Sequence, residues 1–180
     1  MLAAWFGAAL SAFPVAALAG GIGINYAATK SVEDEYQLDA RIEFELGDAI
    51  AAAVEHGVEL HIDVFVRVER ERKWLWDPVV AEKSLSYTLQ HHPLSQDYIV
   101  TDLANDSQHP FPSISAALKH IGDITNLPLV GADAVAGESS YTGYIRAGLN
   151  IQMLPAPLQP AAYVSEKWRM QSAWYEWVVR

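Results

Sequence analysis

The alternation of apolar and polar residues from Tyr36 to Leu46 constrains the fold of this chain more than any other feature. Every even-numbered position in it is apolar, and every odd-numbered position is polar or charged. Successive side chains of a β-strand point to opposite faces of a sheet, so the pattern predicts a strand with one buried and one solvated face. Residues 58–68 follow the same rule, with Phe65 as the single apolar residue on the polar side.

Further strands are expected along the chain. A third long alternation covers residues 141–153. Shorter apolar patterns predict strands at Ile22–Tyr26, Leu85–Leu89, Tyr98–Thr101 and Trp174–Val179. Long alternating strands keep one solvated face, which is typical of antiparallel sheets.

Two short helices are expected between these strands. The first covers residues 47–57, with Asp48 as its N-cap and Gly57 as its left-handed end. The second begins at Ser113 or Ser115 and ends at Gly122. With about seven strands and two short helices, the sequence predicts an α+β fold dominated by antiparallel β-structure, and a β-sandwich is one arrangement that fits.

Residues 1–19 differ from the rest of the chain because they contain no charged side chain. Their apolar run has about the length of a secretory signal core, and Ala17-Leu18-Ala19 matches a small-x-small cleavage site. We therefore expect an export signal at residues 1–19 and a single domain at residues 20–180. The alternatives are an uncleaved N-terminal anchor and an N-terminal helix of the core.

Two features of the composition exclude whole classes of function. The chain has no cysteine, which rules out disulfide scaffolds, cysteine nucleophiles and thiolate metal sites. It has 22 acidic and 12 basic side chains and a formal net charge of −10. A surface this negative argues against binding to nucleic acid or to anionic lipid. Membrane contact is expected only through an N-terminal segment that stays uncleaved.

The sequence contains no motif with catalytic or metal-binding spacing. The six histidines form no H-E-x-x-H pair, and no serine stands in a G-x-S-x-G turn. We therefore expect a protein without enzymatic activity, cofactor or metal. An enzymatic alternative would assemble its site from His61, Asp63, His92 or Arg146, although no spacing supports that set.

Tryptophan provides the candidate binding surface. Every tryptophan after Trp5 falls into one of two segments. The candidate residues are Arg72, Trp74, Trp76 and Asp77 in the first segment, and Trp168, Trp174 and Trp177 in the second. Such rings pack the edge of a core in one interpretation and form an exposed platform in the other, because tryptophan and arginine dominate binding hot spots. In a strand, Trp174 and Trp177 lie on opposite faces.

The order of several motifs resembles a known family. The segments that carry the likeness are Arg72-Lys73-Trp74-Leu75-Trp76-Asp77, Tyr87-Thr88-Leu89-Gln90-His91-His92-Pro93-Leu94, Leu154-Pro155-x-Pro157 and Ser172-Ala173-Trp174-Tyr175-Glu176-Trp177. In this order they resemble the DUF4390 family of exported proteobacterial proteins, whose function is not assigned. The resemblance implies a periplasmic domain, with an inner-membrane anchor facing the periplasm as the alternative. Members are often encoded beside a membrane-bound sensor kinase of the NtrY type, which makes such a kinase the expected partner.

Two functions follow from these observations. The first is a non-catalytic domain that binds an envelope protein through the tryptophan segments, with Arg72 and Asp77 fixing the orientation. The second is a carrier for a small molecule or lipid, in which the same rings line a pocket between sheet and helix.

Overall fold

Two antiparallel sheets make up most of the computed structural model, which describes residues 20–71, 78–135 and 139–179. The smaller sheet has the strand order β1-β2-β7, and the larger has the order β6-β5-β4-β3-β8-β9. The strands are β1 (Gly21–Val32), β2 (Glu35–Glu45), β3 (Leu60–Arg70), β4 (Val79–His92), β5 (Asp97–Asp102), β6 (Ser107–Phe111), β7 (Asp123–Gly131), β8 (Tyr141–Leu149) and β9 (Tyr175–Val178). The helices are α1 (Asp48–Glu55), α2 (Ile114–Gly122) and α3 (Gln159–Val164), with 3₁₀ helices at Ala132–Val135, Ile151–Met153 and Glu166–Trp168. The predicted class is confirmed, with nine strands in the described part of the chain where about seven were expected.

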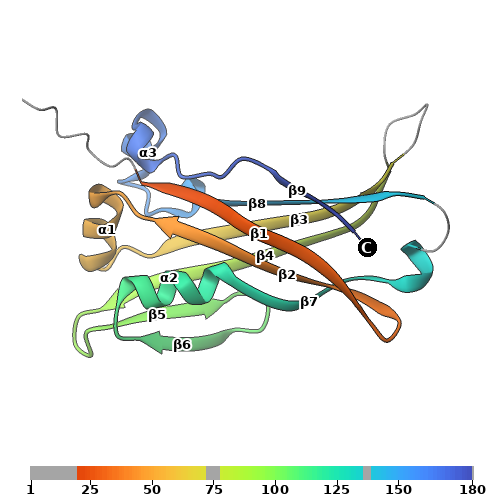
Figure 1. Ribbon diagram of the computed structural model, residues 1–180. Helices are drawn as coiled ribbons and strands as arrows, with labels where there is room; N and C mark the ends of the chain where they lie inside the picture. The colour runs from red at the N-terminus through yellow and green to blue at the C-terminus, as the bar shows by residue number, and fades with distance from the viewer. Residues whose placement is uncertain (1–19, 72–77, 136–138, 180) are drawn as a thin grey trace, which may run out of the picture.

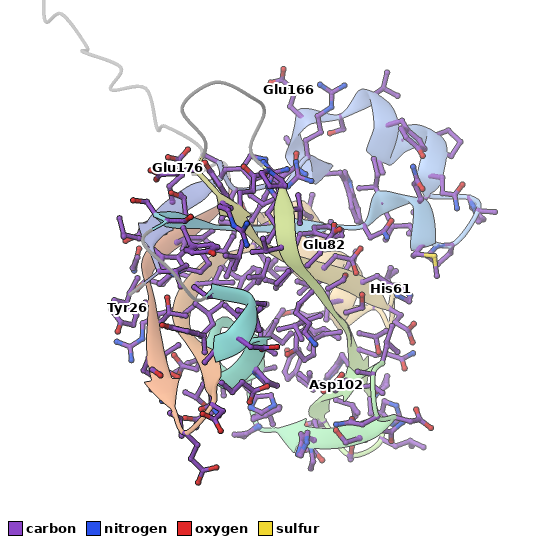
Figure 2. The ribbon with its side chains drawn as sticks, turned by 90° about the vertical axis from the view of Figure 1, so that its right-hand side faces the viewer. Tyr26, His61, Glu82, Asp102, Glu166 and Glu176 are labelled. Carbon is purple, nitrogen blue, oxygen red and sulfur yellow. The ribbon has the colours of Figure 1, made fainter. Side chains whose placement is uncertain are left out.

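The three-stranded sheet packs on one face of the six-stranded sheet, and α1 and α2 extend that layer at one end (Figure 1). We call the covered face of the six-stranded sheet its inner face and the opposite face its outer face. A view along the strands shows the two layers, with Tyr26 on the outside of the smaller sheet and His61 on the far side of the larger one (Figure 2). The arrangement is a β-sandwich with a helical end.

Two apolar clusters share the inner face. The first lies between the two sheets and includes Leu38, Ile42, Val64, Val66, Ile145 and Trp177. The second lies under α1 and α2 and includes Ile50, Val54, Leu60, Leu89, Val100 and Ile121. The even-numbered positions of β2 and β3 supply both clusters, so the predicted orientation of these two strands is confirmed.

The structure confirms some of the predicted helix ends and corrects one of them. The hydroxyl of Ser113 accepts a hydrogen bond from the main-chain N–H of Ala116, so Ser113 is the N-cap of α2. For α1 the prediction of Asp48 as the N-cap is wrong, because Gly47 occupies that position and Asp48 is the first helical residue. Gly57 follows α1 with φ +84°, the left-handed conformation expected there. Within the described residues, no helix combines the length and the apolar character needed to span a membrane.

Three differences from the sequence prediction have a local cause. Strands β6 and β7 were not predicted, because Pro110 and Pro128 interrupt their apolar pattern. In β7, Asn126 also adopts φ +54°, which breaks the alternation of side chains. The third long alternation ends as a strand at Leu149, because Asn150 caps the 3₁₀ helix that follows it.

Candidate functional site

Five side chains form a continuous stack on the outer face of the six-stranded sheet. Strand β3 contributes Phe65 and Arg67, β8 contributes Tyr144 and Arg146, and Trp174 directly precedes β9. The register places Phe65 opposite Arg146 and Arg67 opposite Tyr144. Opposite residues of an antiparallel pair share a face and lie close enough for their side chains to touch. We call these five residues the arginine–aromatic stack.

Within the stack, Trp174 contacts both guanidinium groups. Arg67 Cζ lies 4.8 Å from the centre of the Trp174 ring and 5.0 Å from that of Tyr144. Arg146 Cζ lies 4.5 Å from the centre of the Trp174 ring and 5.7 Å from that of Phe65. These distances lie within the range of cation–π attraction, about 6 Å. The rings therefore hold both guanidinium groups in place, and Trp174 remains partly exposed.

The two arginines differ in their charged neighbours. Arg67 Nε lies 3.1 Å from Glu69 Oε1. The Arg146 side chain has no hydrogen bond or ion pair with any residue of the described ranges, and its Nε, like that of Arg67, is buried without a hydrogen-bond partner. A guanidinium group presents its N–H donors in one plane and binds a carboxylate with two of them. Arg146 is thus a positioned cation that pairs with no carboxylate of the described residues.

The structure separates the predicted tryptophans by environment. Trp174 lies in the stack on the outer face, whereas Trp177 is 8% exposed on the inner face, so the two lie on opposite faces as predicted. Trp177 Nε1 donates to Thr29 Oγ1 at 2.8 Å. Trp168 is partly buried and packs against the cluster under α1. The other predicted site residues, Arg72, Trp74, Trp76 and Asp77, lie outside the described residues.

Four members of the stack were not among the predicted binding residues. Phe65 carried the one visible signal, because it is apolar on the polar side of an alternation. Arg67 and Arg146 occupy polar-face positions of the kind that solvated charges also occupy. The sequence does not show which residues of β3 and β8 lie opposite each other, so it could not show that these side chains stack on Trp174.

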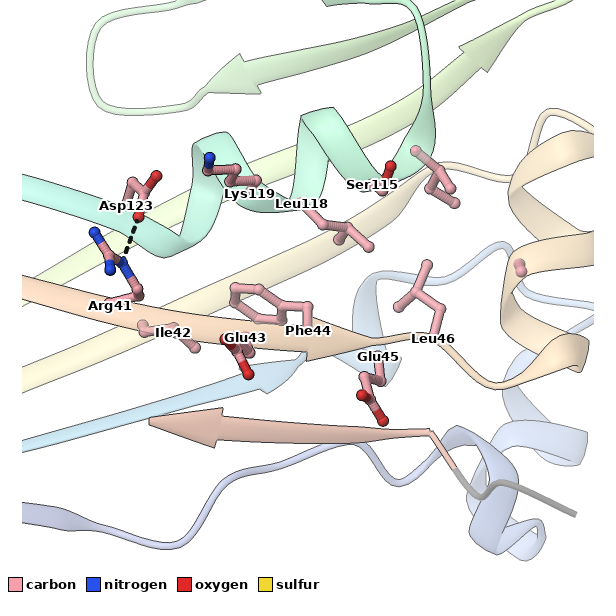
Figure 3. Close-up of a pocket in the computed structure, with 12 residues that line it drawn as sticks. Arg41, Ile42, Glu43, Phe44, Glu45, Leu46, Ser115, Leu118, Lys119 and Asp123 are labelled. Atoms are coloured by element: carbon pink, nitrogen blue, oxygen red, sulfur yellow. Dashed lines mark hydrogen bonds and ion pairs between the residues drawn. The ribbon is translucent and has the colours of Figure 1, made fainter. Parts of the chain in front are cut away.

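A separate groove of about 690 Å³ lies between the end of β2 and helix α2 (Figure 3). Its apolar lining includes Ile42 and Phe44 from β2, Leu46 directly after β2, and Ile114 and Leu118 from α2. It therefore stands between sheet and helix, where a carrier pocket was expected. Its aromatic ring is that of Phe44, and none of the tryptophans in the described ranges lines it.

A smaller, polar pocket lies between the β5–β6 hairpin and β7. The rings of His109 and His120 meet there, with their centres 5.2 Å apart. Burial, together with the nearby His109, lowers the pKa of His120, and burial, together with Asp102, raises the pKa of Tyr87. Both shifts favour the uncharged side chain. No three His, Asp or Glu side chains of the described residues are grouped so that they could hold a metal ion.

The residues of the enzymatic alternative are spread along the six-stranded sheet. His61 Nε2 lies 2.9 Å from Glu59 Oε1. The Asp63 carboxylate accepts hydrogen bonds from Ser86 Oγ at 2.7 Å and Asn150 Nδ2 at 2.9 Å. His92 lies at the last position of β4, and Arg146 belongs to the stack. The structure does not bring these four residues together.

Comparison with known proteins identifies the family but not an activity. No curated protein and no solved structure matches the chain. Residues 19–178 match DUF4390, which is described as a domain of unknown function. The match covers nearly the whole chain and agrees with the motif order in the sequence, so the chain belongs to the DUF4390 family.

Proposed function

We propose that this chain is a non-catalytic interaction domain of the bacterial envelope that binds a protein partner through the arginine–aromatic stack. The observation that carries the proposal is Trp174, which is partly exposed and contacts both Arg67 and Arg146. Tryptophan, tyrosine and arginine are the residues most enriched in binding hot spots, and the stack contains all three.

The stack is also arranged before a partner arrives. Its guanidinium groups already lie against rings, so binding costs little further side-chain entropy. Arg146 pairs with no carboxylate of the described residues, which favours a partner that presents an acidic side chain at this position. Val178, which is 55% exposed on the neighbouring edge strand β9, lies opposite Thr142 and adds apolar area on the same face, one residue pair beyond Tyr144 and Glu176.

The predicted export signal and the family resemblance support the proposed place of action and the proposed partner. The export signal predicted at residues 1–19 supports a periplasmic location, with an inner-membrane anchor facing the periplasm as the alternative. The family resemblance supports the extracytoplasmic part of a membrane sensor kinase of the NtrY type as the partner.

Photo-crosslinking in cells tests this proposal. A photoreactive amino acid at Val178 lies beside the stack without altering it, and one at Tyr26, 50% exposed on the other sheet, is the matched control. We expect Val178 to yield a discrete crosslink to an envelope protein and Tyr26 to yield none. Equal labelling at both positions, or none at Val178 in folded protein, contradicts the proposal.

A charge variant then links the crosslink to the stack. Arg146→Met keeps much of the side-chain volume but removes the cation, and we expect it to abolish the Val178 crosslink. Lys167→Met removes an exposed charge elsewhere and should leave the crosslink unchanged. An undiminished crosslink in folded Arg146→Met would show that the partner does not use the stack.

One observation favours the second candidate function, a small-molecule or lipid carrier. The groove between β2 and α2 has an apolar lining and a volume suited to a small ligand. A carrier would retain its ligand during purification, so native mass spectrometry of the intact protein should show added mass that is lost on unfolding.

A further inference from the structure

Strand β2 extends beyond its neighbour β7. The β2–β7 pairing runs from Glu35 opposite Gly131 to Arg41 opposite Asp123, where β7 begins. On its other side, β2 stays paired with β1 as far as Glu45. The last part of β2 therefore has a strand on one side only, and the groove of Figure 3 occupies the other side.

The main chain of Phe44 faces this open side. A Cβ atom added at Gly122, where α2 ends, would lie 2.0 Å from the carbonyl oxygen of Ile42, so that oxygen points towards α2. A Cβ atom added at Gly20 would lie 2.4 Å from the carbonyl oxygen of Glu45, which therefore points towards β1. Main-chain groups of successive strand residues point to alternate sides, so the N–H and C=O of Phe44 point into the groove.

None of the described residues is a hydrogen-bond partner for these groups on that side. Within the described part of the chain, no main-chain hydrogen bond reaches Phe44 from α1, α2 or a loop. The Phe44 and Leu118 side chains extend into the space between β2 and α2, and Leu46 continues the apolar wall (Figure 3). The groove thus combines an unpaired strand edge with apolar walls, which is the combination that binds an extended peptide.

The charges at the groove favour an anion at one end. Glu43 and Glu45 point away from α2, on the other side of β2 (Figure 3). At the end where β7 begins, Arg41 Nε lies 3.2 Å from Asp123 Oδ1, so the charges of these two side chains compensate each other. Lys119 lies at the same end and is exposed, and its side chain makes no ion pair or hydrogen bond with the described residues.

We infer that the groove binds the C-terminal segment of a partner protein as an added strand, with apolar residues at alternate positions. Such a segment would continue the β2–β7 ladder in the direction of β7, antiparallel to β2. Its last residue would then lie near Lys119, where a free carboxylate complements the unpaired ammonium group. A bound acyl chain would fill the apolar space but leave the Phe44 main chain without a hydrogen bond. The inference is independent of the arginine–aromatic stack, which lies on the outer face of the other sheet.

Fluorescence anisotropy with a defined probe tests the inference on the full-length chain. The probe is a fluorescein-labelled hexapeptide of alternating threonine and valine with a free carboxylate. We expect saturable binding, weaker by about threefold when the carboxylate is amidated, because an exposed ion pair contributes little. N-methylation of the main-chain nitrogens that face β2 should weaken binding about tenfold, because it removes ladder hydrogen bonds.

Matched variants locate the site. Ser115→Trp fills the groove from an exposed position, and we expect it to abolish binding, whereas Ser95→Trp, in an exposed turn, should bind like the original chain. Lys119→Glu should lower the affinity for the free-carboxylate peptide to that for the amide, and Lys167→Glu should not. Peptide binding should also slow hydrogen exchange at the Phe44 amide.

Two outcomes would overturn the inference. In one, the affinity for the peptide is unchanged by the Ser115→Trp substitution or by N-methylation of the peptide. In the other, the peptide does not bind, whereas dodecanoate, tested in parallel, does bind the original chain. Dodecanoate must then also fail to bind the folded Ser115→Trp variant. The second outcome would support the carrier function.

Discussion

Trp174 and Trp177 are three residues apart, and their surroundings have almost nothing in common. Trp177 lies on the inner face, 8% exposed, packed among aliphatic side chains and hydrogen-bonded to Thr29. Trp174 lies on the outer face, partly exposed, against Arg67 and Arg146. The comparison shows that the face of the sheet decides whether a ring in this segment is buried in the core or stays partly exposed to solvent.

The same contrast extends along β3. Val64 and Val66 point inward and are 0% and 1% exposed, whereas Phe65 and Arg67 between and beside them belong to the outer stack. Removing apolar surface from water stabilises the fold by about 25 cal/mol per Å², while a partly exposed cation–π contact contributes roughly 0.5–1 kcal/mol. We therefore expect substitutions on the inner face to reduce stability most, and substitutions on the outer face to affect binding most.

The largest effect is expected for Trp177→Ala. The substitution leaves a cavity on the inner face and removes the hydrogen bond to Thr29, and it should lower the free energy of unfolding by about 3–5 kcal/mol. Urea unfolding followed by circular dichroism measures this change. A loss below about 1 kcal/mol would mean that the inner ring is not a core residue, and the contrast with Trp174 would disappear.

A smaller loss is expected for Gly143→Ala. A Cβ atom at this position would lie 2.3 Å from two ring atoms of Trp177, so the ring must move. We expect a loss of about 1–3 kcal/mol, as for other overpacked cores. The matched control is Gly21→Ala, where a Cβ atom meets nothing within 4 Å and the stability should change little. Equal unfolding midpoints for the two variants would contradict the tight packing of Trp177.

The next effect on stability concerns the Asp39 carboxylate of β2, whose polar contacts lie away from the inner face. The Asp39 carboxylate accepts hydrogen bonds from the Asn126 main-chain N–H and from Lys30 Nζ, both at 2.7 Å. These contacts, the Asn126 hydrogen bond most of all, lower the pKa of Asp39 below its ordinary value of 3.8. A lowered pKa in the folded state stabilises the fold at pH values above 3.8, and this contribution is lost as the pH falls through the folded-state pKa.

Asp39→Asn removes this dependence. Near neutral pH we expect the variant to be less stable by up to about 1 kcal/mol, because the carboxylate is partly exposed. The difference should vanish in acid, where both chains carry a neutral side chain. Urea unfolding at a series of pH values measures the difference, and a gap that stays constant into acid would contradict the assigned role of the charge.

A loss of stability well below that of Trp177→Ala is expected for Trp174→Ala. The substitution removes two cation–π contacts from a partly exposed position, so the free energy of unfolding should fall by about 1–2 kcal/mol. The partner crosslink at Val178 should nevertheless be lost. Urea unfolding and the crosslink are measured on the same variant, and a stability loss as large as that of Trp177→Ala would show that both rings are structural.

The sequence predicted the parts of the fold that repeat a local rule. The alternation in residues 36–46 and 58–68 identified β2 and β3 and the faces that they bury, since period 2 is a property of the strand itself. Strand β7 escaped prediction because Asn126 and Pro128 are not typical of a strand interior. Asn126 is held there by Asp39, a contact 87 residues apart in sequence, and Pro128 is tolerated because β7 is an edge strand of its sheet.

The candidate site was less predictable than the fold for a related reason. The sequence shows that Arg67 and Arg146 lie on polar faces, but only the pairing of β3 with β8 shows that they share one face with Trp174. The groove depends on where β7 begins opposite β2, which no pattern in the sequence indicates.

The hydrogen bond between Trp177 and Thr29 has a consequence for the order in which the molecule is assembled. It joins residues 148 positions apart, on the first and the last strand. At a synthesis rate of roughly 5–20 residues per second, Thr29 is made about 7–30 s before Trp177. During that interval the growing chain lacks the ring that fills one end of its core. The core between the two sheets can therefore be completed only after Trp177 has been made, wherever the chain folds.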